Sequence, residues 1–226
     1  MKQYKLNSSN LSAISERVAV PNYNRKNITT GIVHVGVGGF HRAHEAMYID
    51  QLLEDAANAN WGICGVALLN FDQKIYNVLK EQDGLYTLVI KELDGTLTKE
   101  VIGSITEYLF APDSPKAVIE KMADKATKII TLTITEGGYN LNEATGEFNY
   151  ENPTIIHDKN NPAEPKTIFG YLTQALALRK ENTFQSCPEC EGQGYVQWGT
   201  SYKETQECDY CEGHGRWVRN KNQEVL

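Results

Sequence analysis

The stretch GIVHVGVGGFHRAHEAMY, residues 31–48, predicts the fold of most of the chain. It opens with a short run rich in valine and isoleucine, residues 32–37, which is typical of a strand buried on both faces of a parallel sheet. Gly36, Gly38 and Gly39 mark the end of this run, and a segment with helical periodicity follows. Glycines in a strand-to-helix turn let the backbone approach a phosphate, whose charge is stabilised by N–H groups at the start of the helix.

These glycines match a dinucleotide-binding fingerprint in part. Gly36 and Gly38 occupy its first two positions, but His41 stands where a third glycine normally allows close packing of the helix on the strand. Arg42 could compensate by pairing with a phosphate. A nucleotide site is one interpretation of this turn, and an ordinary strand-to-helix turn without a ligand is the other.

A second apolar run, residues 61–69, predicts the neighbouring parallel strand. In a dinucleotide fold, an acidic residue at the end of this strand binds the adenosine ribose hydroxyls and disfavours a 2′-phosphate. Asp72 is the carboxylate available for this role, although it could equally be the N-cap of a helix over residues 73–81. Since no basic residue stands at the strand end, the sequence favours NAD over NADP without excluding NADP.

The rest of the first 183 residues predicts further α/β structure. Asp94-Gly95 is a hairpin turn signal between two short strands. A strand over residues 128–135 delivers Glu136 and Gly137 at its carboxyl end, where ligands bind in open parallel sheets. The alternative for this loop is a tight turn with an exposed glutamate. The remaining predictions are an irregular arm at 1–30, helices at 42–58, 114–124 and 167–181, hairpin strands at 85–91 and 96–102, and a surface loop at 143–165.

Several spaced motifs agree in order with one protein family. GVGGFHRAHEAMYID, WGICGVALLNFDQKI, TLTITEGGYN and TGEFN resemble the N-terminal half of the long-chain mannitol dehydrogenases, a family that includes fructuronate and related sugar-acid reductases. The resemblance covers about residues 25–183. It implies a Rossmann-type α/β fold, a mostly parallel sheet with flanking helices, that binds NAD for hydride transfer to or from a sugar alcohol or sugar acid.

The resemblance also assigns roles to residues. It places the TEGGY loop beside the nicotinamide, with Glu136 lining the route to the substrate. The family's catalytic lysine lies in a second domain, in a Lys-x4-Asn-x2-His pattern that occurs nowhere in this sequence. We therefore assign no catalytic residue and expect the chain alone to be inactive on polyols. The candidate cofactor-binding residues are Gly36, Gly38, Gly39, Phe40, Arg42, Asp72, Glu136 and Gly137.

The end of the chain departs from that family and predicts a second domain, residues 184–226, after a dinucleotide-binding domain at 1–183. Two CxxCxGxG repeats place two pairs of cysteines seventeen residues apart, a spacing typical of a zinc ribbon closed by four thiolates. The repeats resemble the cysteine-rich segments of DnaJ-type chaperones, which carry four such repeats instead of two. The predicted zinc ligands are Cys187, Cys190, Cys208 and Cys211.

Composition limits the partners. The net charge of −7 argues against nucleic-acid binding by the whole chain, and residues 185–226 also carry more acidic than basic side chains. No apolar run reaches the length of a membrane span, and the N-terminus lacks the apolar centre of a signal peptide, so we expect a cytoplasmic protein. The rival hypothesis is a non-catalytic module whose zinc ribbon contacts a protein or, against its charge, a nucleic acid.

Overall fold

The computed structural model describes residues 3–142, 144–186, 195–198, 204–207 and 216–218, with side chains up to residue 180 except that of Glu136. The chain divides into two compact units, Met1–Ala175 and Leu176–Leu226. The division falls within one helix, α7 (Ile168–Thr183). The first unit contains the sheet that the glycine-rich stretch predicts.

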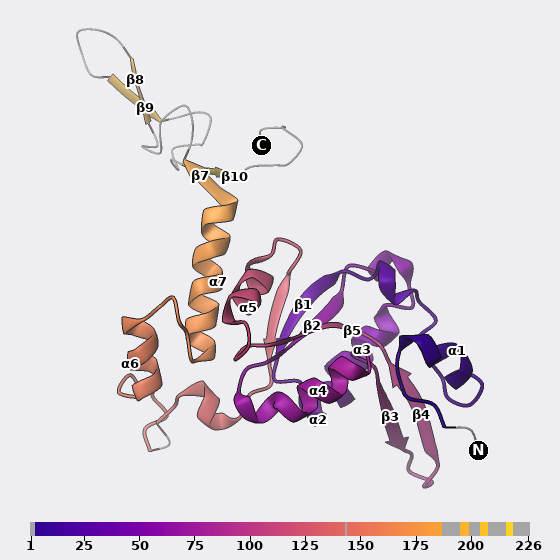
Figure 1. The fold of residues 1–226 in the computed structure, drawn as a ribbon. Helices are drawn as coiled ribbons and strands as arrows, with labels where there is room; N and C mark the ends of the chain where they lie inside the picture. Colours follow the sequence, from indigo (N-terminus) through magenta and orange to yellow (C-terminus); the bar gives the residue numbers. More distant parts are fainter. Residues whose placement is uncertain (1–2, 143, 187–194, 199–203, 208–215, 219–226) are drawn as a thin grey trace. The chain divides into compact units, whose positions relative to one another are not determined.

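A four-stranded parallel sheet forms the centre of the first unit (Figure 1). Its strands are β1 (Thr30–Val35), β2 (Gly62–Ala67), β5 (Ile105–Phe110) and β6 (Ile129–Leu132), in the spatial order β5-β2-β1-β6. Both β1 and β2 are buried along their whole length, as continuous apolar runs in a parallel sheet require. The prediction of a Rossmann-type α/β fold is confirmed for this unit, and the strand order reverses between β1 and β6.

Helices follow the strands of this sheet in sequence. One helix was expected over residues 42–58, and that prediction is wrong in part. His44 leaves the helical region (φ −126°, ψ −88°), so two shorter helices form and the second ends at Leu52. The helices predicted at 73–81 and 114–124 are confirmed. These elements are α2 (Gly39–Ala43), α3 (Glu45–Leu52), η3 (Ala56–Asn58), η4 (Asn70–Asp72), α4 (Gln73–Glu81) and α5 (Pro115–Ala123).

The interior between the sheet and its helices is apolar. Ile32 of β1, Ile63 of β2 and Ile105 of β5 are each 4% exposed or less. They form one cluster with Ala46 of α3 and Leu79 of α4. Each of the isoleucine and leucine side chains stabilises the fold by roughly 1.5–3 kcal/mol when it leaves water. This core fixes the strands whose carboxyl ends carry the site described below.

A hairpin lies between α4 and β5 in sequence. Its strands, β3 (Tyr86–Lys91) and β4 (Leu97–Ile102), pair antiparallel around Asp94-Gly95, as predicted. The strand β5 that follows was not predicted, because residues 105–110 mix polar with apolar side chains and lack the continuous apolar run of β1 and β2. The strand predicted over residues 128–135 is confirmed but shorter, since β6 ends at Leu132.

Arg25 helps to anchor the N-terminal arm, which is less irregular than predicted. Arg25 donates from Nε to the Gly103 carbonyl at 2.8 Å and from Nη2 to the Ile105 carbonyl at 2.8 Å. A guanidinium carries five donors in a fixed fork, so one side chain can hold the arm against the start of β5. The elements of the arm are η1 (Ser8–Asn10), α1 (Leu11–Ile14) and η2 (Arg25–Asn27).

The predicted surface loop at 143–165 contains a helix, α6 (Pro153–Asn160), so that prediction is wrong over these residues. The Asn152 side chain accepts a hydrogen bond from the N–H of Thr154, and Pro153 occupies the first helical position, where its missing N–H is not needed. Asn-Pro is therefore the start signal that the sequence interpretation missed. The helix predicted at 167–181 is confirmed as α7.

The second unit is described mainly through its backbone pairs. β7 (Phe184–Ser186) pairs antiparallel with β10 (Arg216–Val218), and β8 (Tyr195–Trp198) pairs antiparallel with β9 (Glu204–Glu207). The four cysteines predicted to bind zinc lie outside the described residues. Among the helices in the described part of the chain, none combines the length and the apolar character that a membrane span needs.

We expect Gly36→Ala to destabilise the domain by about 3–5 kcal/mol. Gly36 has φ +94°, and an added Cβ would lie well inside contact distance of the Thr133 carbonyl oxygen. Gly95→Ala is the matched control, because Gly95 has φ +88° but no heavy atom lies within 4 Å of its added Cβ. The control should cost only about 1–2 kcal/mol. Urea unfolding measures both, and equal losses would show that β1 does not approach Thr133 closely.

Candidate functional site

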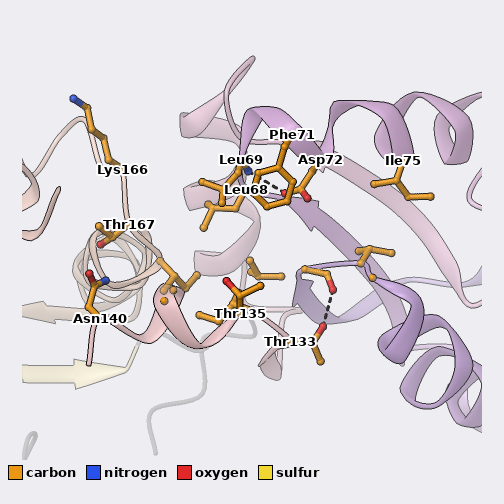
Figure 2. A pocket seen from close by; sticks show the side chains of 18 of the residues that line it. Leu68, Leu69, Phe71, Asp72, Ile75, Thr133, Thr135, Asn140, Lys166 and Thr167 are labelled. Atoms are coloured by element: carbon orange, nitrogen blue, oxygen red, sulfur yellow. Dashed lines mark hydrogen bonds between the residues drawn. The ribbon is translucent and has the colours of Figure 1, made fainter. Parts of the chain in front are cut away.

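A cavity of about 590 Å³ lies at the carboxyl ends of the parallel strands (Figure 2). It lies where the strand order reverses between β1 and β6, which is the place where open α/β sheets bind ligands. Its walls come mainly from four segments, residues 35–42, 68–75, 133–140 and 152–168. The volume is in the range of small-molecule and cofactor sites.

The glycine turn after β1 gives the cavity an open backbone wall. The Thr133 hydroxyl donates to the Gly36 carbonyl at 2.6 Å, which fixes the turn against the end of β6. A Cβ added to Gly39 would meet no heavy atom within 4 Å, and one added to Gly38 would meet only the Gly36 carbonyl oxygen at 3.8 Å. All three glycines line the cavity. Since the protein leaves the space beside Gly38 and Gly39 unfilled, a ligand can reach the backbone there.

Arg42 and Phe40, both candidates from the sequence, take different places. Arg42 lines the cavity, and its Nη1 donates to the Val37 carbonyl at 2.9 Å. A guanidinium has five N–H groups, so this bond leaves donors that can face an anion. Phe40 is 68% exposed and stacks on the His44 ring, with ring centroids 4.3 Å apart. It is not among the residues that line the cavity.

Asp72 lines the cavity just after β2 (Figure 2). Its Oδ2 accepts a hydrogen bond from the N–H of Leu69 at 3.1 Å, which closes the turn η4. Asp72 also stands at the N-cap position of α4, but its side chain makes no cap hydrogen bond there. A carboxylate has about four acceptor sites, so the bond to Leu69 leaves capacity for the ribose hydroxyls that the sequence predicts as its ligand.

The TEGGY loop follows β6 and forms a 3-10 turn, η5 (Glu136–Tyr139). Gly137 and Gly138 line the cavity, and a Cβ added to Gly137 would meet no heavy atom within 4 Å. Asn140 ends the turn in the left-handed region (φ 52°) and is buried. The side chain of Glu136 lies outside the described residues, so its role beside a substrate stays a prediction.

A polar wall of the cavity was missed in the sequence interpretation. Asn140, Lys166 and Thr167 contribute to it, with Asn152 and Thr154 from the start of α6. The Asn152 amide donates from Nδ2 to the Asn140 Oδ1 at 2.5 Å, and its Oδ1 accepts from the Thr154 hydroxyl at 2.7 Å. These residues fell in the predicted surface loop or beside it. The Asn-Pro start of α6 is the signal that could have located Asn152 and Thr154.

The sequence profile described as the mannitol dehydrogenase Rossmann domain matches residues 30–198 of the chain. The chain belongs to the mannitol dehydrogenase family. This membership confirms the resemblance drawn from the spaced motifs. The matched range ends at residue 198, beyond residue 183, near which the resemblance was expected to end.

Curated relatives of the chain are named mannitol dehydrogenases. The mannitol 2-dehydrogenase of Pyrenophora tritici-repentis is 48% identical over 197 residues, which cover 85% of this chain and 34% of the relative. A mannitol dehydrogenase of Saccharomyces cerevisiae is 43% identical over 187 residues, which cover 80% of this chain and 37% of the relative. The chain therefore spans little more than a third of the length of these relatives.

Two solved structures of family enzymes share the fold. The ternary complex of Pseudomonas fluorescens mannitol 2-dehydrogenase with NAD and D-mannitol superposes with a TM-score of 0.75 at 43% identity, over 79% of this chain and 36% of that chain. A substrate-free D-sorbitol dehydrogenase gives a TM-score of 0.73 at 41% identity, over 78% of this chain and 37% of that chain.

Behind the glycine turn of this mannitol dehydrogenase-family domain lies a buried histidine, His34 of β1. Its Nδ1 lies 3.1 Å from Glu45 Oε2 and 2.7 Å from the Thr131 hydroxyl. Its Nε2 lies 2.9 Å from the Thr133 hydroxyl and 3.2 Å from the Gly36 carbonyl oxygen. One imidazole thus connects the turn and β6 to a carboxylate of α3, which holds the turn in place.

His41 stacks on His34. Together with Glu45, these two histidines form a group in which possible metal-ligand atoms lie within 4.8 Å of one another. The two rings lie 3.5 Å apart at an interplanar angle of 13°, so their in-plane lone pairs run parallel and do not converge on one ion. Burial, and next the neighbouring His34, lowers the pKa of His41 to about 3. His41 is therefore neutral at neutral pH, and the cluster supports the turn.

We expect His41→Phe to remove part of the pH dependence of stability. The native pKa of about 3 lies below the ordinary 6.5, so unfolding takes up a proton in this window and wild-type stability falls as the pH drops from about 6.5 toward 3. One proton contributes up to about 1.4 kcal/mol per pH unit. Urea titrations at several pH values should give a shallower slope for the variant, and identical slopes would contradict a neutral buried His41.

Proposed function

We propose that this chain is the cofactor-binding part of a polyol dehydrogenase and that it binds NAD. The open glycine wall at the switch point carries the proposal, because Cβ atoms added to Gly38, Gly39 and Gly137 would meet nothing closer than 3.8 Å in the cavity wall. Family membership supports the choice of cofactor, since the Pseudomonas fluorescens relative was solved with NAD and D-mannitol.

The residues around the cavity fit the parts of a dinucleotide in order. Asp72 at the end of β2 would accept the adenosine ribose hydroxyls, and the glycine turn with Arg42 would hold the pyrophosphate. Gly137 after β6 would lie against the nicotinamide. The negative charge of Asp72 disfavours a 2′-phosphate, and for this reason we propose NAD and not NADP. When bound, the nicotinamide supplies the site that accepts or gives up a hydride.

We propose a sugar alcohol or sugar acid as the substrate of the whole enzyme, in line with the mannitol and sorbitol dehydrogenases to which the chain is similar. Oxidation of an alcohol also needs a base for the hydroxyl proton. The Lys-x4-Asn-x2-His pattern that carries this base in the family is absent from these 226 residues. These residues alone would therefore bind the cofactor but not turn over a polyol. Within the whole enzyme, Glu136 would line the route to the substrate.

We further propose a zinc ribbon in residues 184–226, after a cofactor domain at 1–183. The CxxC spacing supports it, and so do the paired strands β7–β10, which flank the cysteines in sequence. Four thiolates leave no open position on zinc, so its role would be structural. The alternative function is a ribbon that contacts a protein partner, since its acidic surplus argues against nucleic acid. A cytoplasmic location stays a prediction from the sequence.

Titration of the purified chain with NADH tests cofactor binding. We expect saturable energy transfer from tryptophan in the wild type and an affinity at least roughly thirtyfold lower in Gly38→Asp, because a carboxylate there would repel the pyrophosphate. Gly38→Asn is the matched control for added volume without charge and should lose much less. The backbone at Gly38 (φ −82°, ψ −174°) suits any residue, so all variants should fold. No saturation at millimolar NADH would refute the proposal.

Metal analysis of the same chain tests the zinc ribbon. We expect about one zinc ion per chain, lost in Cys187→Ser and in Cys208→Ser. Cys64→Ala is the matched control, because Cys64 is buried within β2 and should not affect zinc content. NADH affinity should survive the loss of zinc if the two segments act independently. A chain purified without chelators that holds no zinc would eliminate the site.

A further inference from the structure

We propose that Asp158 is a positioning residue for the cofactor: it locks the polar wall of the cavity that faces the nicotinamide half of the dinucleotide. This inference rests on the proposed function. Asp158 belongs to α6 and is itself not among the residues that line the cavity. It acts through the segment that joins α6 to α7, where Lys166, Thr167 and Ile168 line the cavity.

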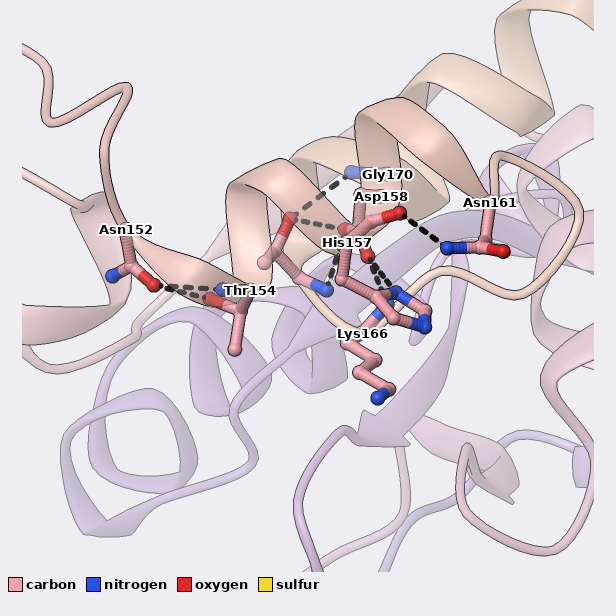
Figure 3. A network of polar contacts seen from close by, with 8 residues as sticks. Asn152, Thr154, His157, Asp158, Asn161, Lys166 and Gly170 are labelled. Carbon is pink, nitrogen blue, oxygen red and sulfur yellow. Dashed lines mark hydrogen bonds and ion pairs between the residues drawn. The ribbon is translucent and has the colours of Figure 1, made fainter.

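The Asp158 carboxylate accepts three hydrogen bonds from that segment (Figure 3). Oδ1 accepts the backbone N–H of Lys166 at 2.7 Å, and Oδ2 accepts the backbone N–H of Thr167 at 2.8 Å and its hydroxyl at 2.7 Å. Two consecutive amides and a hydroxyl aimed at one carboxylate fix both the path of the backbone and the rotamer of Thr167.

The hydrogen-bond network around Asp158 continues into the first turn of α7. The Thr167 hydroxyl oxygen accepts the N–H of Gly170 at 3.2 Å, so the residue held by Asp158 also caps that helix. Gly170 leaves room for the carboxylate, since a Cβ added there would lie far inside contact distance of Asp158 Oδ2. The missing side chain at Gly170 thus leaves the space between α6 and α7 that the Asp158 carboxylate fills.

The same helix also supplies the neighbouring part of the wall. Asn152 and Thr154 at the start of α6 line the cavity, and Asn152 bonds to Asn140 at the end of the TEGGY turn. Asp158 lies one to two turns further along α6 and ties that helix to Thr167. The wall formed by the TEGGY turn, α6 and the start of α7 is therefore one connected unit, on the β6 side of the glycine turn.

The charge of Asp158 strengthens its hydrogen bonds to Lys166 and Thr167. Burial raises the pKa of this carboxyl, but the hydrogen bonds from Thr167 and the Lys166 amide outweigh that effect and leave the pKa below its ordinary value. His157 adds a further contact, with Nδ1 3.3 Å from Asp158 Oδ1. Asp158 is only 9% exposed, so these bonds are made by an ionised acceptor shielded from water.

Asp158→Asn tests the inference, because the amide keeps the shape but replaces one carboxylate oxygen by an N–H donor, which then faces either the Lys166 N–H or the N–H and hydroxyl of Thr167. The purified chain is titrated with NADH and, separately, with adenosine diphosphate, which lacks the nicotinamide half. We expect roughly a tenfold loss of NADH affinity in the variant, with adenosine diphosphate affinity unchanged within about twofold. Glu164→Gln on the same connection is the matched control and should change neither affinity.

Thr167→Val and Thr167→Ser keep the test informative if Asp158→Asn fails to fold. Valine removes the hydroxyl and should selectively weaken NADH binding, whereas serine keeps it and should bind like the wild type. Equal losses for NADH and adenosine diphosphate, or no loss for either in a folded variant, would overturn the positioning role. A wild-type chain that binds neither nucleotide would instead refute the proposed function on which the inference rests.

Discussion

The site depends on one close approach, that of the turn at Gly36 to the end of β6. The Thr133 hydroxyl bonds to the Gly36 carbonyl, and the Thr133 backbone occupies the space that any Cβ at position 36 would need. Because the turn sits at φ +94°, only glycine adopts it without strain. The chain can therefore leave β1 sharply, and the cavity opens between β1 and β6.

Buried polar contacts make this turn rigid from behind. His34 reaches the Gly36 carbonyl and Thr133 with one ring nitrogen and Glu45 with the other, so β1, β6 and α3 are joined under the turn. Such polar groups are stabilising in a core only when they are satisfied together. The polar wall has a comparable support in Asp158 of α6, whose carboxylate accepts hydrogen bonds directly from the N–H and hydroxyl of Thr167. Both sides of the cavity are thus held by residues that lie outside it.

Local sequence signals predicted the elements whose cause is local. Short apolar runs predicted β1 and β2, and Asp94-Gly95 predicted the hairpin, because turn chemistry and burial pattern act within a few residues. β5 was missed because it is an edge strand that pairs only with β2 in this sheet, so its sequence mixes polar with apolar side chains and lacks a continuous apolar run. α6 was missed because the polar composition of its surroundings outweighed the Asn152-Pro153 start signal.

The amino-acid sequence by itself determined the strand–glycine–helix unit, the family and the candidate residues around Gly36, Asp72 and Gly137, because each depends on residue types at short spacing. Only the tertiary structure decided which residues share a cavity. Phe40, a candidate from the sequence, points outward, whereas Asn140 and Thr167, which were not candidates, line the cavity. It also placed Asp158 against residues eight and nine positions later. Such contacts follow from how strands and helices pack, and packing depends on the whole core, which no short stretch of sequence specifies.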